Sequence, residues 1–211
     1  MADLTERGMQ RRIEAFFDKL APTWDHEVAA PFAPRLAEML DELGISPGDT
    51  VLDVGAGTGV LAGLLVDRVG PRGRIIAVDL SRGMLHEGKT LRRNDPIAWV
   101  QADVLDAPFP ASVFDWVLCY SVFPHFLDQQ LAVNRFASLL KPGGSLAVLH
   151  SQSREAINEH HEKVGDVVGG HILPDDDGMA RLIRNAGLEL LRLENTEDGF
   201  IALARRPASA Q

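Results

Sequence analysis

Three carboxylates lie where short β-branched runs of the chain end. Asp53 opens the glycine-rich stretch 53–59 (DVGAGTG). Asp79 ends the next β-branched run, and Asp103 follows the third. In parallel α/β sheets the residues just after each strand border the ligand crevice, where a carboxylate can accept hydrogen bonds from ribose hydroxyls or an exocyclic amine. The three acids therefore predict a site for a nucleoside-like ligand. Each such charge-assisted hydrogen bond would contribute about 1.5–3 kcal/mol to binding.

The glycines of that stretch indicate a tight turn that opens a helix. Gly55, Gly57 and Gly59 allow positive φ and let a ligand touch the backbone, while the helix N-terminus supplies free N–H donors. A dinucleotide-binding turn has a further glycine at the sixth place of G-x-G-x-x-G, and here that place holds Val60. Val60 therefore disfavours an NAD-linked oxidoreductase, which remains the alternative enzyme class on this kind of fold.

Histidines gather in the second half of the chain, which holds five of the seven: His125, His150, His160, His161 and His171. If residues 154–165 are helical, His160 and His161 fall on the two shoulders of the buried stripe and lean toward the end of the preceding strand. We expect His125, His150 and His161 to be candidate general bases, and the alternative is that they are ordinary lid residues bonded to the backbone. No H-x-x-x-H or H-E-x-x-H pair is present, so we predict no metal; a metal centre would need His150, His160, His161 and His171.

The acids and histidines lie on a series of alternating strands and helices that begins at residue 50. Short β-branched runs separated by helical stretches are typical of βαβ units that feed a parallel sheet. Strands are expected at 50–54, 73–79, 97–101, 113–120 and 144–150, followed by a terminal hairpin of 188–194 and 199–204. Helices are expected near 58–69, 82–93, 128–140, 154–165 and 177–186, after two amphipathic helices that end at Pro22 and Gly44. The predicted fold class is α/β: a Rossmann-like, doubly wound, seven-stranded, mostly parallel sheet with an antiparallel last strand and helices on both faces.

Caps at two of these helices follow from the sequence. Ser81 is expected to cap the helix that follows Asp79, which leaves that carboxylate free for a ligand. The run 175–177 (DDD) is expected at a helix start, which the helix dipole favours, and Gly187 is expected to end the same helix.

Chain length and net charge limit the domain organisation and the possible partners. The 211 residues can bury one hydrophobic core, as expected for a single domain. The net charge of −9 repels nucleic acid and anionic lipid, so neither is expected as a partner. The single cysteine, Cys119, and the absence of a signal peptide or membrane-length apolar run favour the cytoplasm. We expect a helical cap over 1–44, a ligand-binding domain over 45–206 with a lid-like segment at 151–175, and a tail at 207–211.

Five stretches in order resemble the motifs of class I S-adenosylmethionine-dependent methyltransferases. They are VLDVGAGTGVLA at 51–62, VDLSRGML at 78–85, QADVLDAPFP at 101–110, FDWVLCYSVFPHF at 114–126 and LKPGGSLAV at 140–148. The resemblance covers about two thirds of the chain. It implies S-adenosyl-L-methionine as cofactor and transfer of its methyl group to a small-molecule acceptor.

Roles follow from the resemblance position by position. Gly55, Gly57 and Gly59 would line the methionine portion, and Asp53 would steady that turn and the cofactor's ammonium group. Asp79 would hold the ribose, with Leu80 also in contact with the cofactor. Met84 would pack beside the adenine, and Asp103 with the N–H of Val104 would bind the adenine edge. Tyr120 and Ser121 would face the sulfonium and the acceptor.

Within this class the N-terminal stretch FFDKLAPTWDHEV resembles the cofactor-covering segment of ubiquinone/menaquinone-type and generic small-molecule methyltransferases. That segment commonly has Tyr-Asp where this chain has Trp24 and Asp25, so Trp24 would close the site by stacking or shape and not through a hydroxyl. A cofactor-binding module that lacks catalysis is the remaining alternative. The sequence predicts neither the acceptor nor the oligomeric state.

Overall fold

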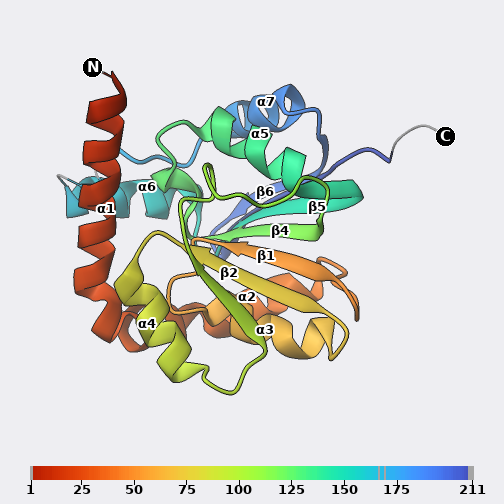
Figure 1. Ribbon diagram of the computed structural model, residues 1–211. Helices are drawn as coiled ribbons and strands as arrows, with labels where there is room; N and C mark the ends of the chain where they lie inside the picture. The colour runs from red at the N-terminus through yellow and green to blue at the C-terminus, as the bar shows by residue number, and fades with distance from the viewer. Residues whose placement is uncertain (1, 166, 169, 209–211) are drawn as a thin grey trace.

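All the strands of the computed structural model, which describes residues 2–165, 167–168 and 170–208, belong to one sheet of order β3-β2-β1-β4-β5-β7-β6 (Figure 1). They are β1 (Thr50–Val54), β2 (Arg74–Asp79), β3 (Ile97–Gln101), β4 (Phe114–Tyr120), β5 (Leu140–His150), β6 (Glu189–Thr196) and β7 (Gly199–Arg205). The first five strands pair in parallel, and β7 runs antiparallel to both β5 and β6. The predicted seven-stranded, mostly parallel sheet with an antiparallel last strand is confirmed.

Helices cover both faces of the sheet, as predicted. They are α1 (Ala2–Trp24), α2 (Ala33–Asp41), α3 (Val60–Val69), α4 (Arg82–Leu91), α5 (Gln129–Leu139), α6 (Arg154–Val164) and α7 (Asp176–Asn185), with short turns η1 (Asp25–Ala29), η2 (Ala30–Phe32) and η3 (Phe123–His125). One apolar cluster joins α2 and α3 to the sheet through residues such as Met39 and Leu65. A second cluster joins α5 and α7 to the opposite face through Phe136 and Met179 (Figure 1). The strand order reverses between β1 and β4, so the crevice expected in a doubly wound sheet lies at their carboxyl ends.

The first helix is longer than the sequence indicates. We predicted that it ends at Pro22, whereas α1 continues to Trp24 with Pro22 inside it. A proline inside a helix removes one backbone hydrogen bond and crowds the preceding turn. The extension keeps Trp24 on the face that carries Phe17, and their rings meet edge to face with centroids 5.6 Å apart. This tertiary contact is one gain that offsets the loss at Pro22.

The fifth strand also begins before the predicted residue 144. It starts at Leu140, which pairs with Phe114, and the next pair joins Ser145 to Trp116. The intervening residues form an irregularity in the register. Lys141 in this irregularity donates to both carboxylate oxygens of Asp115, at 2.8 and 3.0 Å. This ion pair holds the start of the strand against β4.

Helix ends follow the predicted chemistry. Ser81 accepts from the N–H of Met84 at 3.0 Å, and Asp175 accepts from the N–H of Gly178 at 2.7 Å. Gly187 takes φ +73° after α7. The N–H of Leu188, the next residue, donates to the backbone oxygen of Ile183 in the helix, as in a Schellman cap.

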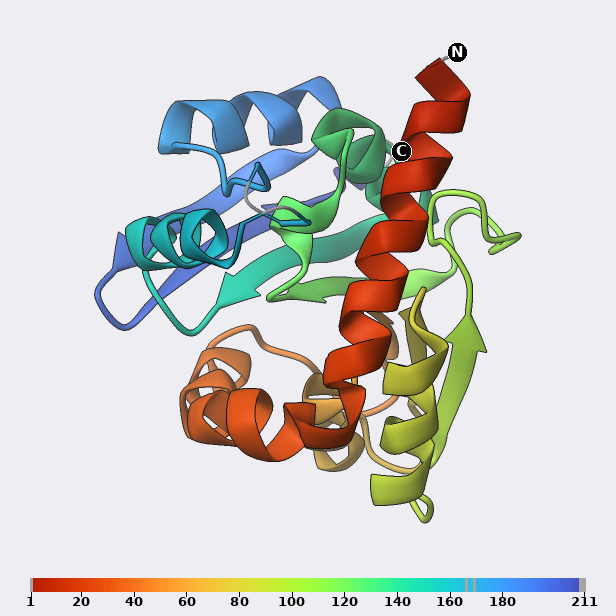
Figure 2. The ribbon, with the colours of Figure 1, turned by 90° about the vertical axis from the view of Figure 1, so that its left-hand side faces the viewer.

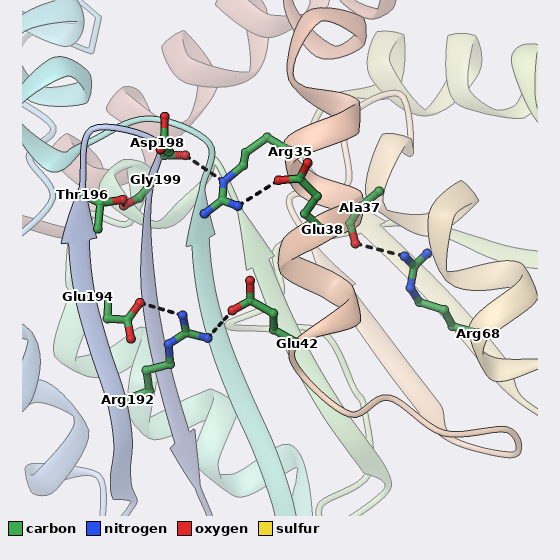
Figure 3. A network of polar contacts seen from close by, with 10 residues as sticks. All are labelled: Arg35, Ala37, Glu38, Glu42, Arg68, Arg192, Glu194, Thr196, Asp198 and Gly199. Atoms are coloured by element: carbon green, nitrogen blue, oxygen red, sulfur yellow. Dashed lines mark hydrogen bonds and ion pairs between the residues drawn. The ribbon is translucent and has the colours of Figure 1, made fainter.

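Polar contacts tie α2 to the terminal hairpin (Figure 3). Arg35 Nε donates to the backbone oxygen of Asp198 at 3.0 Å. Arg192 in β6 pairs with Glu42 and Glu194, each at 2.6 Å. These exposed contacts are individually worth about 0–1 kcal/mol, but through Arg35 and Glu42 they fasten α2 and its C-terminal end to the hairpin at two points.

Helix α2 packs on a face of the sheet, whereas helix α1 lies across the carboxyl ends of the parallel strands. In Figure 2 it is the red helix in front of those strand ends. It packs chiefly on α4. Within the residues that the structure describes, no helix combines the length and the apolar character that crossing a membrane would need. The arrangement places α1 over the expected ligand crevice.

Candidate active site

A cavity of about 860 Å³ lies at the carboxyl ends of the strands, beneath α1. The ends of β1, β2, β4 and β5 form its floor, and α1 and α6 contribute its walls. The predicted residues that line it are Gly55, Gly57, Asp79, Leu80, Met84, Asp103, Val104, Tyr120, Ser121, Trp24, His125, His150, His160 and His161. Asp53, Gly59 and His171 are not among the residues that line this cavity.

Two of the three glycines bring the backbone to the cavity floor. Gly55 has φ +65°, and a Cβ there would lie 2.2 Å from a methyl group of Val122. Gly57 has φ +55°, and a Cβ there would lie 3.7 Å from Nε1 of Trp24. Gly59 has φ +79°, and a Cβ there would lie 2.4 Å from the ring of Trp99. Gly59 therefore has a packing role beside its place at the start of α3.

Asp79 joins the end of β2 to the glycine turn. Its Oδ2 accepts from the N–H of Gly57 at 2.8 Å, and its Oδ1 accepts from the N–H of Ser81 at 2.7 Å. The sequence suggested a carboxylate free for a ligand, whereas both of its oxygens have backbone contacts. Each oxygen still has a second lone pair that can accept a ribose hydroxyl. Burial raises the pKa of Asp79 to about 6, against the lowering effect of the two backbone donors.

Asp53 is buried, with 1% of its surface exposed. Its Oδ2 has no hydrogen-bond partner among the described residues. Burial, followed by the nearby charge of Asp79, raises the pKa of Asp53 to about 8. This carboxyl group therefore lies in the interior behind the turn, where burial favours its protonated form.

Asp103 and Val104 form the far end of the cavity, after β3. Asp103 Oδ1 accepts from the N–H of Leu105 at 2.9 Å. Its Oδ2 accepts from the side-chain amide of Gln10 at 2.7 Å. The amide of Gln10, from α1, is the same kind of N–H donor that the amino group of adenine would offer.

Helix α1 and the turn η1 after it are fastened over the site by two carboxylates that the sequence interpretation missed. Asp18 accepts from Ser81 Oγ at 2.6 Å and from the N–H of Gly83 at 2.8 Å. Asp25 accepts from Thr58 Oγ1 at 2.9 Å and pairs with Arg92 at 3.5 Å. The available signal was their seven-residue spacing, which puts both acids on one side of a helix after two turns.

The ends of β4 and β5 carry hydroxyl groups beside the cavity. The hydroxyls of Tyr120 and Ser151 lie 3.0 Å apart and share a hydrogen bond. Ser121 takes φ +54°, a conformation that residues other than glycine adopt rarely and that is enriched at functional sites. The strained residue lies at the strand end where the acceptor is expected.

Three histidines meet beside the cavity, and two of them, His125 and His161, line it. His125 Nδ1 lies 3.1 Å from His171 Nδ1, and the rings of His125 and His161 have centroids 4.9 Å apart. His161 Nδ1 donates to the backbone oxygen of His171 at 2.6 Å. Burial lowers the pKa of all three, most strongly that of His125. All three imidazoles are therefore neutral near pH 7.

His150 stands apart from these three at the end of β5. It is 3% exposed and lines the cavity, and its Nε2 has no partner among the described residues. Burial, with a smaller contribution from His161, lowers the pKa of His150 to about 3. A buried imidazole nitrogen without a partner costs free energy, so this atom is a natural contact point for a ligand.

The four histidines that a metal centre would need do not surround a common point. His160 is exposed, His161 bonds to the backbone, and His171 faces a different hollow. Across the part of the chain that the structure describes, no group of three or more His, Cys, Asp or Glu side chains is arranged to hold a metal ion.

Comparison with known proteins identifies the class. A family model described as "Methyltransferase domain" matches residues 52–148. The ubiquinone/menaquinone biosynthesis C-methyltransferase UbiE of Vibrio cholerae serotype O1 is 33% identical over 194 residues, which cover 79% of this chain and 74% of the relative. The chain belongs to the class I S-adenosylmethionine-dependent methyltransferases. This methyltransferase uses S-adenosylmethionine to methylate a small-molecule acceptor, which sets aside the oxidoreductase alternative.

Solved structures show the same fold at lower identity. A S-adenosylmethionine-dependent methyltransferase from Aquifex aeolicus superposes with a TM-score of 0.68 and 20% identity, over 92% of this chain and 98% of that one. A putative methyltransferase in complex with the Trm112 activator of Haloferax volcanii has a TM-score of 0.77 and 19% identity, over 90% and 97% of the two chains. These likenesses agree with the Rossmann-like fold of the methyltransferase.

Proposed function

We propose that the cavity holds S-adenosylmethionine along the ends of β1 to β3 and the acceptor against the histidines. The observation that supports the cofactor position is the place of Asp79, which lines the cavity and at the same time accepts a hydrogen bond from Gly57. The cradle fits the cofactor, because Gly55 and Gly57 present bare backbone to the cavity and two strand-end carboxylates remain able to accept hydrogen bonds. Asp79 would hold the ribose, Asp103 and Val104 the adenine edge, and Leu80 and Met84 the apolar surface beside them.

The remaining cofactor residues would act from the turn and the cap. Gly55 and Gly57 would face the methionine portion, while Asp53 and Gly59 would shape the turn from outside the cavity lining. Trp24 would close the site from α1 by shape, since its indole lies beside Gly57. We propose the segment 1–44 as the cap, 45–206 as the catalytic domain and 151–175 as a lid. Residues 209–211 of the proposed tail 207–211 lie outside the described residues.

Methyl transfer in this cavity depends mainly on alignment. S-adenosylmethionine supplies an electrophilic methyl group whose bonding electrons leave on a neutral sulfur. Holding an acceptor at near-attack distance contributes on the order of 7–11 kcal/mol, and a general base adds about 10²–10⁴-fold when the acceptor must lose a proton. Tyr120 and Ser121 would border the reacting atoms, and His125, His150 and His161 are the candidate bases.

His150 is also a candidate for binding the acceptor directly. Its buried Nε2 lacks a partner among the described residues, and a hydroxyl or carbonyl group of an acceptor would supply one. Because burial holds this imidazole neutral, it would favour a polar but uncharged group. The reducing cytoplasm is the proposed compartment, which suits the buried free thiol of Cys119.

Calorimetry with S-adenosylhomocysteine tests the cofactor half of this proposal. We expect binding by the wild type and much weaker binding by Asp79→Ala. A matched control is Asp67→Ala, which removes an exposed carboxylate from α3. Binding that is equal in all three proteins would contradict the assignment of Asp79.

A methyl-transfer screen tests the acceptor half. Labelled S-adenosylmethionine would be incubated with a panel of small molecules, beginning with ubiquinone and menaquinone precursors because the Vibrio relative is named for those pathways. Transfer of label to a member of the panel is the expected result. Tight cofactor binding with no transfer to any acceptor would instead indicate the module without catalysis.

A further inference from the structure

Two histidines span the wall between the main cavity and a second hollow. His125 lines the main cavity. His171 lines a separate, outer hollow of about 560 Å³ that is bordered by residues at the start of α5. The two imidazoles meet through their Nδ1 atoms at 3.1 Å. They therefore form a continuous polar connection through a wall that is otherwise built from residues such as Phe126 and Leu127.

The hydrogen bond between the two Nδ1 atoms contains one proton. In the tautomer that leaves His125 able to act as a base, His125 carries that proton and donates it to the lone pair of His171 Nδ1. His125 Nε2 then has a lone pair for the cavity, and His171 carries its own proton on Nε2. Neither ring is charged in this state.

The position of His171 is held by other groups and not by this bond alone. His161 Nδ1 donates to the backbone oxygen of His171 at 2.6 Å, so the proton of His161 is committed to a carbonyl group that can only accept. Asn158 accepts from the N–H of Leu173 at 2.8 Å and donates to its backbone oxygen at 3.1 Å. Helix α6 thus fixes the backbone on both sides of Ile172, independently of His125.

The surroundings of His125 do not favour a lasting positive charge there. Its titratable neighbours are His161 on α6, His171, and His150 on β5, and the aromatic neighbour on α1 is Phe17, with ring centroids 5.2 Å apart. Burial and these neighbours hold the pKa of His125 well below its usual value. The carboxylate of Asp128 borders the outer hollow as well as the main cavity, and it attracts a proton that leaves through the outer hollow.

We propose that His171 receives a proton from His125 and passes it to water in the outer hollow, so that the two histidines remove from the main cavity the proton that the acceptor loses on methylation. This inference rests on the proposed acceptor site. His125 Nε2 takes the acceptor proton as the acceptor bonds to the methyl carbon. The Nδ1 proton of His125 then moves to His171 Nδ1, and the Nε2 proton of His171 leaves to water. Both rings end neutral, and exchange with water after product release restores the first tautomers.

Nitrogen-15 NMR of the histidine-labelled protein with S-adenosylhomocysteine tests the connection without an acceptor. The readout is the rate at which the imidazole proton of His125 exchanges with water, with His125→Gln used to assign its signal. We expect severalfold slower exchange in His171→Phe, which keeps an aromatic ring of similar shape but has no nitrogen. The control His86→Ala removes an exposed histidine from α4 and should leave the rate unchanged. An unchanged rate in His171→Phe would overturn the proposal.

Two further measurements distinguish a failure of this proposal from a failure of the proposed function. Exchange can be measured in the free protein as well, so a failure to bind S-adenosylhomocysteine would refute the cofactor site and leave the exchange result valid. With an acceptor from the methyl-transfer screen, His171→Ala should lower kcat by about 10²-fold with little change in KM. Added 4-methylimidazole should restore part of the loss through the outer hollow. Loss of activity without any rescue, together with unchanged exchange, would show a merely structural role.

Discussion

The two ends of the cavity differ in charge and in how the chain builds them. The proposed cofactor end is formed by carboxylates that follow consecutive strands, and Asp79 there accepts from the backbone N–H groups of Gly57 and Ser81. The proposed acceptor end is bordered by buried histidines from η3, β5 and α6, with His171 behind them in the segment before α7. His125, His161 and His171 bond to one another or to the backbone, whereas the β5 histidine has a ring nitrogen without a partner among the described residues. One end suits a cationic nucleoside, whereas the other suits an uncharged molecule that gives up a proton.

This difference has a physical consequence for function. In the proposed arrangement, the carboxylates beside the glycine turn bind the cofactor without any group of the acceptor end. The histidines are kept neutral by burial, so they add no positive charge that would repel the sulfonium. Substitutions at one end should therefore leave the other end nearly unaffected.

The largest expected effect is on turnover. His125→Ala should lower kcat by about 10²–10⁴-fold if the acceptor loses a proton, because a positioned base is removed. The dissociation constant of S-adenosylhomocysteine should remain unchanged in calorimetry. A kcat equal to that of the wild type would remove His125 from the mechanism, and a large loss of cofactor affinity would contradict the independence of the two ends.

The next effect is on cofactor affinity. Asp79→Ala should weaken S-adenosylhomocysteine binding by about 10–10²-fold, because hydrogen bonds to a charged acceptor contribute about 1.5–3 kcal/mol. The N–H groups of Gly57 and Ser81 would also lose their partner. Calorimetry of Asp79→Ala beside Asp67→Ala measures the loss, and a change below about twofold would sink the assignment.

A smaller effect is expected at the fastening of α1. Asp18→Ala removes the acceptor for Ser81 Oγ and for the N–H of Gly83. Because these bonds fasten the helix and do not touch the cofactor, only part of their free energy affects binding, so we expect cofactor affinity to fall by up to about tenfold, mainly through faster dissociation. Stopped-flow measurement of the dissociation rate would show this, with Lys19→Ala on the same helix as the matched control. Equal dissociation rates in the two variants would show that the contact does not close the site.

The smallest effect is a pH dependence of binding. Asp79 has a pKa of about 6 in the free protein, and ribose hydroxyls bind its ionised form better. Below pH 6 binding must first remove a proton, so affinity should rise between pH 5 and pH 7 by less than about tenfold and then level off. Asp53, with a pKa of about 8, stays protonated through this range. Isothermal titration at several pH values should show the rise in the wild type and a flat profile in Asp79→Asn.

The cofactor end could be predicted from the sequence because its parts are local. Asp53 and Gly55 share one strand and turn, and the strand-end rule brings Asp79 and Asp103 beside them without further information. The cap could be predicted as helical, but its fastening could not. The contacts of Asp18 with Gly83 and of Gln10 with Asp103 join residues more than sixty positions apart, and no local pattern specifies such pairs.

The histidines show the same limit more strongly. The period of α6 placed His161 toward the site, and His161 does line the cavity. The sequence also suggested that His150, His160, His161 and His171 gather together, whereas the structure pairs His125 with His171 and leaves His150 with a nitrogen that has no partner among the described residues. Which nitrogen meets which depends on rotamers and on the path of the segment 165–175, neither of which has a periodic signature.

The sequence by itself determined the sheet, its strand ends and the chemistry of the cofactor crevice, because hydrophobic periodicity and strand-end positions are local properties of the chain. Tertiary structure alone decided that α1 runs through Pro22 to cover the crevice. It also decided that Asp79 holds the turn, and that His125 and His171 meet across a wall. Those outcomes depend on the free energy of contacts between distant segments, such as Asp18 with Gly83, and that free energy exists only once the chain has folded.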